Sequence, residues 1–349
     1  DERKVRPMTN YERAVWFEHP DAIPMSFSIN RASFDYYNHN DLADLMADHK
    51  YLFPNFDRSS FDFNPPYHPI ARMNEPFTDD FGCIWMTPIN GLTGTVKIHP
   101  LDDWEKFEAY SFPDPEVCMG IGPIDWAKEK ISIDEARTRG EFISRGLRHG
   151  HTFLQLSDIR GYDNLIFDMA DDEPLLMELL DGIEQFNLFI IKRYLEMDVD
   201  QVTYAEDLGM QVGPMISPGH FKKYIKPSYK RLMTPAIEQG KIVHMHSDGD
   251  IRLLVDDIID NSVHVINLQD LVNGIDWIAQ KFRGKKCVEL DIDRQLITVK
   301  GTPQEIDDLI RREVTTIGTP QGGLAMIFGL YPGTPIENVK ALMDAMEKY

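Results

Sequence analysis

Short β-prone runs alternate with helix-like stretches along most of this chain, and this alternation constrains the fold more than any other feature. Eight such runs occur, at residues 23–28, 51–56, 151–156, 201–205, 241–246, 263–268, 286–290 and 324–328. In the stretches 173–186 and 251–259, apolar residues recur with the period of an α-helix. Eight strands that alternate with helices predict an α/β fold, a closed parallel (β/α)8 TIM barrel, with residues 1–349 as a single domain. The second run is the weakest, because Pro54 interrupts it.

One stretch near residues 80–100 breaks this rhythm. Residues 80–88 and 94–100 are rich in β-prone side chains, and they flank the turn-forming pair Asn90-Gly91. Two such runs around a tight turn predict a β-hairpin inserted between a strand and the helix that follows it. We interpret the hairpin as a lid or rim beside the active site, although a surface hairpin without a function would have the same pattern.

The composition limits the partners and the compartment. The chain has 36 Lys and Arg residues against 57 Asp and Glu residues, so its formal net charge is −21. An acidic surface of this size disfavours nucleic acids and anionic membranes as partners. The three cysteines are widely spaced, and no apolar run is long enough to cross a membrane. These features predict a cytoplasmic protein without a disulfide framework.

Polar residues gather at the predicted C-terminal ends of the strands, where (β/α)8 barrels carry their active sites. Three carboxylates are candidates for positioning or protonating a reacting group, namely Asp207, Asp270 and Asp291. Four residues are candidates for contacts with a substrate, namely Arg31, Gln269, Phe328 and Tyr331. Core packing explains the two aromatic residues equally well.

Two histidines in the fifth predicted strand suggest a metal. His244 and His246 are two residues apart, so their side chains project from one face of a strand, roughly 7 Å apart along the backbone. Imidazole nitrogens bind zinc, and a catalytic zinc site needs further ligands beside an open position. Glu206, at the end of the preceding strand, is the nearest candidate for the third ligand, with Asp270, Glu289 and Asp291 as alternatives.

Each of these metal candidates also has a structural interpretation. The Glu206 carboxylate can instead bond backbone amides of the next loop, and the two histidines can be satisfied by neighbouring polar groups. His149 and His151 lie at the start of a predicted strand, which is the wrong end for catalysis. The sequence contains no Walker A loop, GxSxG nucleophile elbow or HExxH motif.

Several motifs resemble the uroporphyrinogen decarboxylase superfamily. Gly329-Leu-Tyr-Pro332 resembles the closing motif of these enzymes, and 268–277 and 289–293 resemble two earlier motifs. Glu206-Asp-Leu-Gly209 looks like a further motif of the same superfamily. The likeness extends over most of residues 8–349, and it implies a (β/α)8 barrel in agreement with the pattern of runs.

The superfamily contains decarboxylases and zinc-dependent methyltransferases that serve corrinoid proteins, and this chain departs from both. The decarboxylases carry several arginines in a first-strand motif and a histidine before the closing motif, where this chain has only Arg31 and Phe328. The methyltransferases carry His-x-Cys on the fifth strand and Cys near the end of the eighth, where this chain has His244-x-His246 and Phe328. The resemblance therefore implies a metal at the histidine pair, with imidazole in place of thiolate.

These observations predict a zinc-dependent methyltransferase. As the resemblance to the first components of anaerobic O-demethylase systems implies, a methyl group would pass from a small methylated donor, such as a methoxylated aromatic compound, to a corrinoid on a partner protein. The superfamily likeness also makes a homodimer an expectation. One alternative is a metal-free carboxy-lyase acting on a small acid, in which the two histidines donate protons and Arg31 and Arg72 hold a carboxylate. Another is a protein that binds a corrinoid or a small aromatic molecule without turnover.

Overall fold

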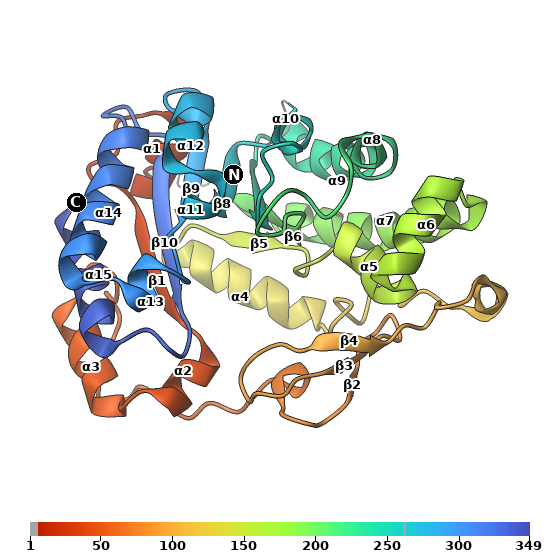
Figure 1. The fold of residues 1–349 in the computed structure, drawn as a ribbon, viewed down its shortest axis with the longest axis horizontal. Coiled ribbons are helices and arrows are strands. Elements are labelled where there is room, and N and C mark those ends of the chain that lie inside the picture. The colour runs from red at the N-terminus through yellow and green to blue at the C-terminus, as the bar shows by residue number, and fades with distance from the viewer. Residues whose placement is uncertain (1–5, 261–262) are drawn as a thin grey trace. The chain divides into compact units, whose positions relative to one another are not determined.

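A computed structural model describes residues 6–260 and 263–349 (Figure 1). The chain divides into two compact units that are built from interleaved segments. The first unit holds Pro76–Trp85 and Thr95–Asn267 together with Arg6 and Pro7. The second unit holds Met8–Glu75, Met86–Gly94 and Leu268–Tyr349. The single domain predicted from the sequence stays a prediction.

The described residues form an α/β fold around parallel strands. The strands are β1 (Met25–Ile29), β5 (Ser144–Gly146), β6 (Gln201–Asp207), β7 (Ile242–Asp248), β8 (Val265–Gln269), β9 (Cys287–Asp291) and β10 (Leu324–Leu330). Their hydrogen-bonded order is β1-β10-β9-β8-β7-β6-β5. Six of the eight predicted runs are confirmed as strands. An eighth strand that would close the barrel is not found in this sheet among residues 6–260 and 263–349.

In the first unit, β6 pairs in parallel with β5 on one side and with β7 on the other. The helices of this unit are α4 (Trp126–Thr138), α5 (Phe153–Arg160), α6 (Tyr162–Asp171), α7 (Pro174–Glu196), α8 (Pro218–His220), α9 (Lys226–Glu238) and α10 (Val255–Ile259), with a π-helical turn at Phe221–Ile225. Pro174 starts α7 where a helix tolerates proline, and the Glu173 side chain caps it by accepting from the Leu175 amide. Buried residues recur along α7 with helical spacing, so the helix packs one apolar face against the core.

In the second unit, β10 pairs in parallel with β1 and β9. Its helices are α1 (Asn10–Trp16), α2 (Arg31–Tyr36), α3 (His39–Asp48), α11 (Asp270–Asn273), α12 (Ile275–Phe282), α13 (Ile297–Lys300), α14 (Pro303–Ile317) and α15 (Ile336–Lys348). A short 3-10 turn occupies Pro69–Ala71. The side chains of Thr302 and Glu305 form a capping box that starts α14.

The run at residues 51–56 is not a strand, so this prediction is wrong. After α3 the chain turns, and the Phe53 amide donates to the carbonyl of His49 at 3.0 Å. The Phe53 ring packs edge-on against Phe27 of β1, with 5.8 Å between the ring centroids. The apolar residues of this run therefore pack into the core from a turn. Pro54 favours a turn over a strand, because it has no backbone N–H to donate in a sheet.

The run at residues 151–156 is also not a strand, because helix α5 begins at its third residue, Phe153. The parallel strand of this region lies earlier, at β5. The first amides of α5 are capped by Glu206, a residue of β6 that is distant in the sequence. The pattern of a short apolar run does not distinguish a strand from a helix. Here the contact of Glu206 with the first amides of α5 favours the helix.

The inserted segment near residues 80–100 forms a small separate sheet. Its strands are β2 (Phe77–Thr78), β3 (Ile84–Met86) and β4 (Thr95–Ile98), in the order β2-β3-β4, and β2 and β3 are antiparallel. The predicted insertion is therefore confirmed, with one additional short strand. A short 3-10 segment, Trp104–Ala109, follows β4.

Membrane-spanning helices were sought across the described part of the chain. None of its helices has both the length and the apolar character that a bilayer crossing requires.

Candidate metal centre

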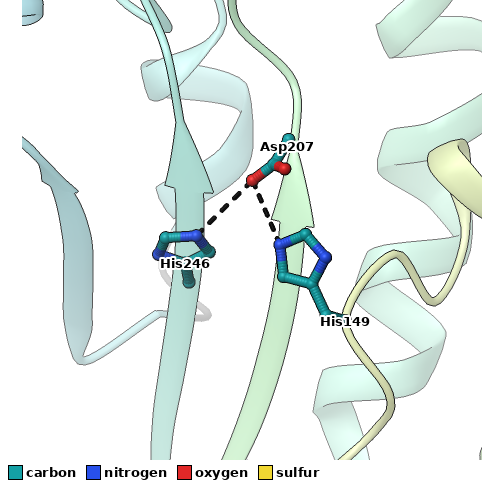
Figure 2. A group of neighbouring side chains, drawn as sticks. All are labelled: His149, Asp207 and His246. Atoms are coloured by element: carbon teal, nitrogen blue, oxygen red, sulfur yellow. Dashed lines mark hydrogen bonds and ion pairs between the residues drawn. The ribbon is translucent and has the colours of Figure 1, made fainter. Parts of the chain in front are cut away.

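The end of β6 carries two carboxylates that project to opposite faces of the sheet, because successive residues of a strand alternate. In the register with β7, Ala205 lies opposite His246 and Asp207 lies opposite Asp248. Asp207 and His246 therefore share one face of the sheet. Figure 2 shows the Asp207 carboxylate between the imidazole rings of His246 and His149.

The three side chains meet through one carboxylate oxygen. Oδ1 of Asp207 lies 3.2 Å from Nε2 of His149 and 3.5 Å from Nε2 of His246. One donor atom from each residue lies within 4.8 Å of the other two. Among residues 6–260 and 263–349, this is the one group of at least three His, Cys, Asp or Glu side chains with such a geometry.

The electrostatics of the cluster are strongly coupled. Burial alone would raise the pKa of Asp207, but hydrogen bonds and charge from His149 and His246 outweigh it and hold the pKa well below its ordinary range. Burial alone would lower the pKa of His246, but the bond to Asp207, the charge of Asp248 and the bond to Asn267 raise the pKa to about 9. Asp207 is therefore an anion, and it stabilises the protonated form of His246.

A second polar contact fixes the orientation of His246. Its Nδ1 atom donates to the side-chain oxygen of Asn267 in β8. This bond orients the ring so that Nε2 faces Asp207, and the raised pKa means that Nε2 carries a proton, which a bound metal would replace. Histidines that bind metals commonly donate their other ring N–H in this way.

His149 lies in the loop that follows β5, and the loop is held on both sides of it. After His149, the Gly150 amide donates to the carbonyl of Ala205 in β6 at 2.8 Å. Before it, the Nε atom of Arg148 donates to the carbonyl of His149 itself at 3.3 Å. The His149 ring is thus positioned at the C-terminal end of β5, the end at which parallel strands carry their active sites.

Arg148 connects this loop to the small sheet. Its buried guanidinium lies 3.4 Å from carboxylate oxygens of both Asp79 and Asp158, and it donates to the carbonyl of Gly120 at 3.3 Å. Asp79 in turn accepts from the Trp85 indole N–H at 2.9 Å and from the amide of Cys83. The segment that carries β2 and β3 therefore supports the backbone of His149 through one arginine.

The donor set and its spacing fit a zinc ion. Zinc bonds of about 2.0–2.2 Å in tetrahedral geometry place ligand atoms about 3.3–3.6 Å apart. The two distances from Asp207 to the histidines are 3.2 Å and 3.5 Å. Two imidazoles and one carboxylate are a ligand set of catalytic zinc sites, which keep a further position open. The same set also binds ferrous iron.

The candidate centre differs from the predicted ligand set in two residues. Glu206 lies on the other face of β6, where its carboxylate accepts from the amides of Thr152 and Phe153 at 2.8 Å and 2.9 Å. It also accepts from the Tyr229 hydroxyl at 2.5 Å. Glu206 therefore caps α5, which was its structural interpretation. Asp207, predicted as a catalytic residue, is the carboxylate of the three-donor cluster.

The three-donor cluster contains His149 and does not contain His244, so a metal role for His244 stays a prediction. His244 is buried opposite Thr203 and is not a member of the three-donor cluster. His149 was set aside because its neighbourhood was assigned to the start of a strand, whereas it follows the end of β5. The sequence signal for His149 was the glycine between His149 and His151, directly after a β-prone segment. A shorter strand that ended before this glycine would have placed His149 after the C-terminal end of the strand.

The remaining predicted catalytic carboxylates lie in the second unit. Asp270 begins α11, is almost fully buried, and accepts from the Asp293 amide at 2.9 Å. Asp291 ends β9 and pairs with Arg294 at 2.9 Å. Both carboxylates are thus bonded within the protein, and a catalytic role for them stays a prediction.

The predicted substrate contacts have different surroundings. Arg31 donates to the carbonyl of Pro65 and to the carboxylate of Asp35, at 2.6 Å and 2.8 Å. Phe328 is buried against Phe27, and Gln269 ends β8. Tyr331 is 41% exposed and, with Phe328, lines a cavity of about 270 Å³ at the ends of β1, β9 and β10. The cavity brings two of the four predicted contacts together.

A comparison with protein families identifies the superfamily. The model of the uroporphyrinogen decarboxylase (URO-D) family matches residues 148–349, which is more than half of the chain. The chain belongs to the uroporphyrinogen decarboxylase family. The resemblance inferred from the Gly329-Leu-Tyr-Pro332 segment and the earlier motifs is thereby confirmed.

A comparison with solved structures finds proteins of similar fold. A methyltransferase from Methanosarcina mazei matches with a TM-score of 0.67 at 16% sequence identity, over 98% of this chain and 99% of that one. A B12-independent methionine synthase from Shewanella sp. W3-18-1 matches with a TM-score of 0.41 at 11% identity, over 65% of this chain and 67% of that one. No curated protein sequence matches the chain. The likeness to the Methanosarcina mazei protein, at 16% identity, shows the fold alone.

Proposed function

We propose that this URO-D family protein is a zinc-dependent methyltransferase that passes a methyl group from a small donor to a corrinoid on a partner protein. The observation that carries the proposal is the three-donor cluster of His149, Asp207 and His246. Membership of the family and the fold shared with a methyltransferase support it. The closed eight-stranded barrel, the homodimer and the cytoplasmic location remain expectations of the same proposal.

A zinc ion held by these residues would supply Lewis acidity at the donor atom that loses the methyl group. In the transfer, the bond between that atom and the methyl carbon breaks heterolytically, and its electron pair stays with the donor atom. A reduced corrinoid on the partner protein, as the methyl acceptor, would supply the electron pair of the new bond to the methyl carbon. The donor atom then takes up a proton from water, and a catalytic role for Asp270 and Asp291 stays a prediction.

The protein's own residues prepare the cluster for this role. Asn267 orients the ring of His246, Arg148 holds the backbone of His149, and Asp207 supplies the negative charge between the two rings. A site whose ligands are fixed in advance by outer contacts binds metal more tightly than one that must order them.

The carboxy-lyase alternative receives less support from the structure. It requires Arg31 and Arg72 to hold a substrate carboxylate. Arg31 instead bonds Pro65 and Asp35 and stacks on the Tyr67 ring, with its guanidinium carbon 4.3 Å from the ring centroid. These contacts favour a structural role for Arg31.

Metal analysis of the purified full chain, together with a transfer assay, tests the proposal. About one zinc per chain is expected, and it should be lost in His149→Ala and His246→Ala but kept in a control variant, His220→Ala, outside the cluster. The assay follows methylation of reduced cobalamin spectroscopically with small methoxylated aromatic acids and methylamines as donors. A zinc-free protein from metal-replete growth, or iron as the bound metal, would contradict the zinc assignment. Zinc without any methyl transfer would contradict the reaction.

A further inference from the structure

A cavity in the second unit combines charge, hydroxyl groups and an aromatic wall. It lies at the ends of β1, β9 and β10 and measures about 270 Å³. Its polar lining includes Ser26 and Ser28 from β1, Asp291 from β9 and Arg294 from the loop that follows. This volume is below the ~300–1,000 Å³ typical of sites for drug-sized ligands, so an occupant would be a small molecule.

Three groups of different chemistry converge at Gly329 in β10. A methyl group added at this glycine would lie 3.5 Å from the Tyr331 ring, 3.6 Å from Oγ of Ser28 and 4.0 Å from Nη1 of Arg294. The space that the glycine leaves open is thus bordered by a ring, a hydroxyl and a guanidinium. A larger residue at position 329 would occupy this space.

The guanidinium of Arg294 is fixed before any ligand arrives. Its Nη2 atom lies 2.9 Å from Oδ2 of Asp291, and its carbon lies 5.5 Å from the centroid of the Tyr331 ring. The preceding residue, Asp293, accepts from the amides of residues 295–298 and so locks the loop. A ligand that binds Arg294 therefore pays little conformational entropy for ordering it.

We propose that this cavity binds the carboxylate of a small organic acid, with Arg294 and Ser28 as its donors and the ring of Tyr331 beside the ligand's apolar body. A guanidinium has five N–H donors in a planar fork, so it can serve Asp291 and a ligand carboxylate together. Ile327 and Phe328 supply apolar lining next to the polar groups.

The charge of the site selects among anions. Asp291 is almost fully buried beside Arg294, and their opposite charges make the net charge of the pair close to zero. A carboxylate adds one negative charge next to Asp291, whereas a phosphate dianion adds two at the same distance. A monoanionic carboxylate with an apolar body therefore fits better than phosphate. The inference uses residues of the second unit alone, and it does not depend on the metal centre.

Calorimetric binding of benzoate and cyclohexanecarboxylate to the full chain tests this assignment, with the two corresponding amides as uncharged analogues. At least one acid should bind, and its amide and inorganic phosphate should bind at least about tenfold more weakly, which is about 1.4 kcal/mol. The same ratio should separate the wild type from Arg294→Gln. Failure of both acids to bind at millimolar concentration, or equal binding of acid and amide, would overturn the proposal.

The variant Gly329→Ala separates occlusion of the site from unfolding. Its added methyl group meets neighbours at ordinary contact distances, and Gly329 is not among the glycines with positive φ, so the fold should persist. We expect loss of acid binding with an unchanged melting temperature. Gly219→Ala is the matched control, because its methyl group would have one neighbour, at 4.0 Å. Equal acid binding by wild type and Gly329→Ala would show that the acid binds elsewhere.

Discussion

Glu206 and Asp207 are consecutive residues of β6 whose carboxylates serve opposite faces of the sheet. Glu206 accepts from the backbone of α5 and from Tyr229, while Asp207 lies between His149 and His246. One strand end thus fixes the helix that follows the His149 loop and also provides the acidic member of the candidate metal centre. These two neighbouring residues therefore have different roles, because Glu206 caps α5 and Asp207 belongs to the candidate metal centre.

Substitution of Asp207 should therefore affect mainly zinc binding, and substitution of Glu206 should affect the stability of the fold. Asp207→Asn should weaken zinc binding at least about tenfold, because a neutral amide replaces the anionic ligand. It should also destabilise the metal-free protein, because the ionised Asp207 interacts favourably with His149 and His246. Glu206→Gln should lower the free energy of unfolding by about 1–3 kcal/mol, because its amide group faces backbone donors that lose an acceptor. Chelator competition and urea denaturation measure the two effects. Loss of zinc in Glu206→Gln with retention in Asp207→Asn would reverse the assignment.

Arg148 should influence zinc affinity without touching the metal. Arg148→Lys keeps the positive charge near Asp79 and Asp158 but replaces the fork that reaches the His149 carbonyl. We expect zinc affinity to fall about 10-fold or more, as for other residues that orient metal ligands. Arg145→Lys, on β5 and paired with Glu129, is the matched control and should leave zinc affinity unchanged. Equal affinities in both variants would remove Arg148 from this role.

The two histidine assignments can be separated by substitution. His149→Ala should abolish stoichiometric zinc binding, because it removes one of three donors. His244→Ala should retain zinc, because its ring is outside the cluster, although its burial makes some loss of stability expected. Zinc content per folded chain, measured by elemental analysis after size-exclusion chromatography, compares them. A zinc-free His244→Ala variant would restore the histidine pair predicted from the sequence.

A buried acidic pair in the second unit should make stability fall as pH rises. Burial first, and then the adjacent Asp270, raise the pKa of Glu313 well above its ordinary value of 4.5; Asp293 acts in the same direction and Arg312 opposes it. Above pH 4.5 the native state therefore holds a proton that the unfolded state releases. The stabilising contribution is complete below that value and is lost as pH rises towards the folded-state pKa, by up to about 1.4 kcal/mol per pH unit.

Glu313→Gln removes this titration and should flatten the pH dependence. The free energy of unfolding in urea, compared between about pH 5 and about pH 8, should fall more for the wild type than for the variant. Glu337→Gln, at an exposed position in the first turn of α15, should behave as the wild type. Parallel pH profiles for the wild type and Glu313→Gln would show that titration of Glu313 does not contribute to the pH dependence of stability.

The sequence predicts the architecture well where β-branched and apolar residues are contiguous, as in β6 and β7. It fails at residues 151–156, because the amides of α5 are capped by Glu206, about fifty positions away, and no local pattern encodes this contact. The same error hid His149 from the predicted site. His246 belongs both to the predicted histidine pair and to the three-donor cluster, whereas the choice between Glu206 and Asp207 depends on which face of the sheet each residue occupies.

The cap of α5 also has a consequence for the order of folding. A helix of eight residues is marginal by itself, and this one obtains its N-terminal acceptor from a strand that the ribosome makes later. A nascent chain that ends between α7 and β6 therefore holds these eight residues without their acceptor. In such a chain the loop with His149 lacks its hydrogen bond to Ala205 and its contact with Asp207. This part of the candidate site therefore becomes ordered only when β6 joins the sheet.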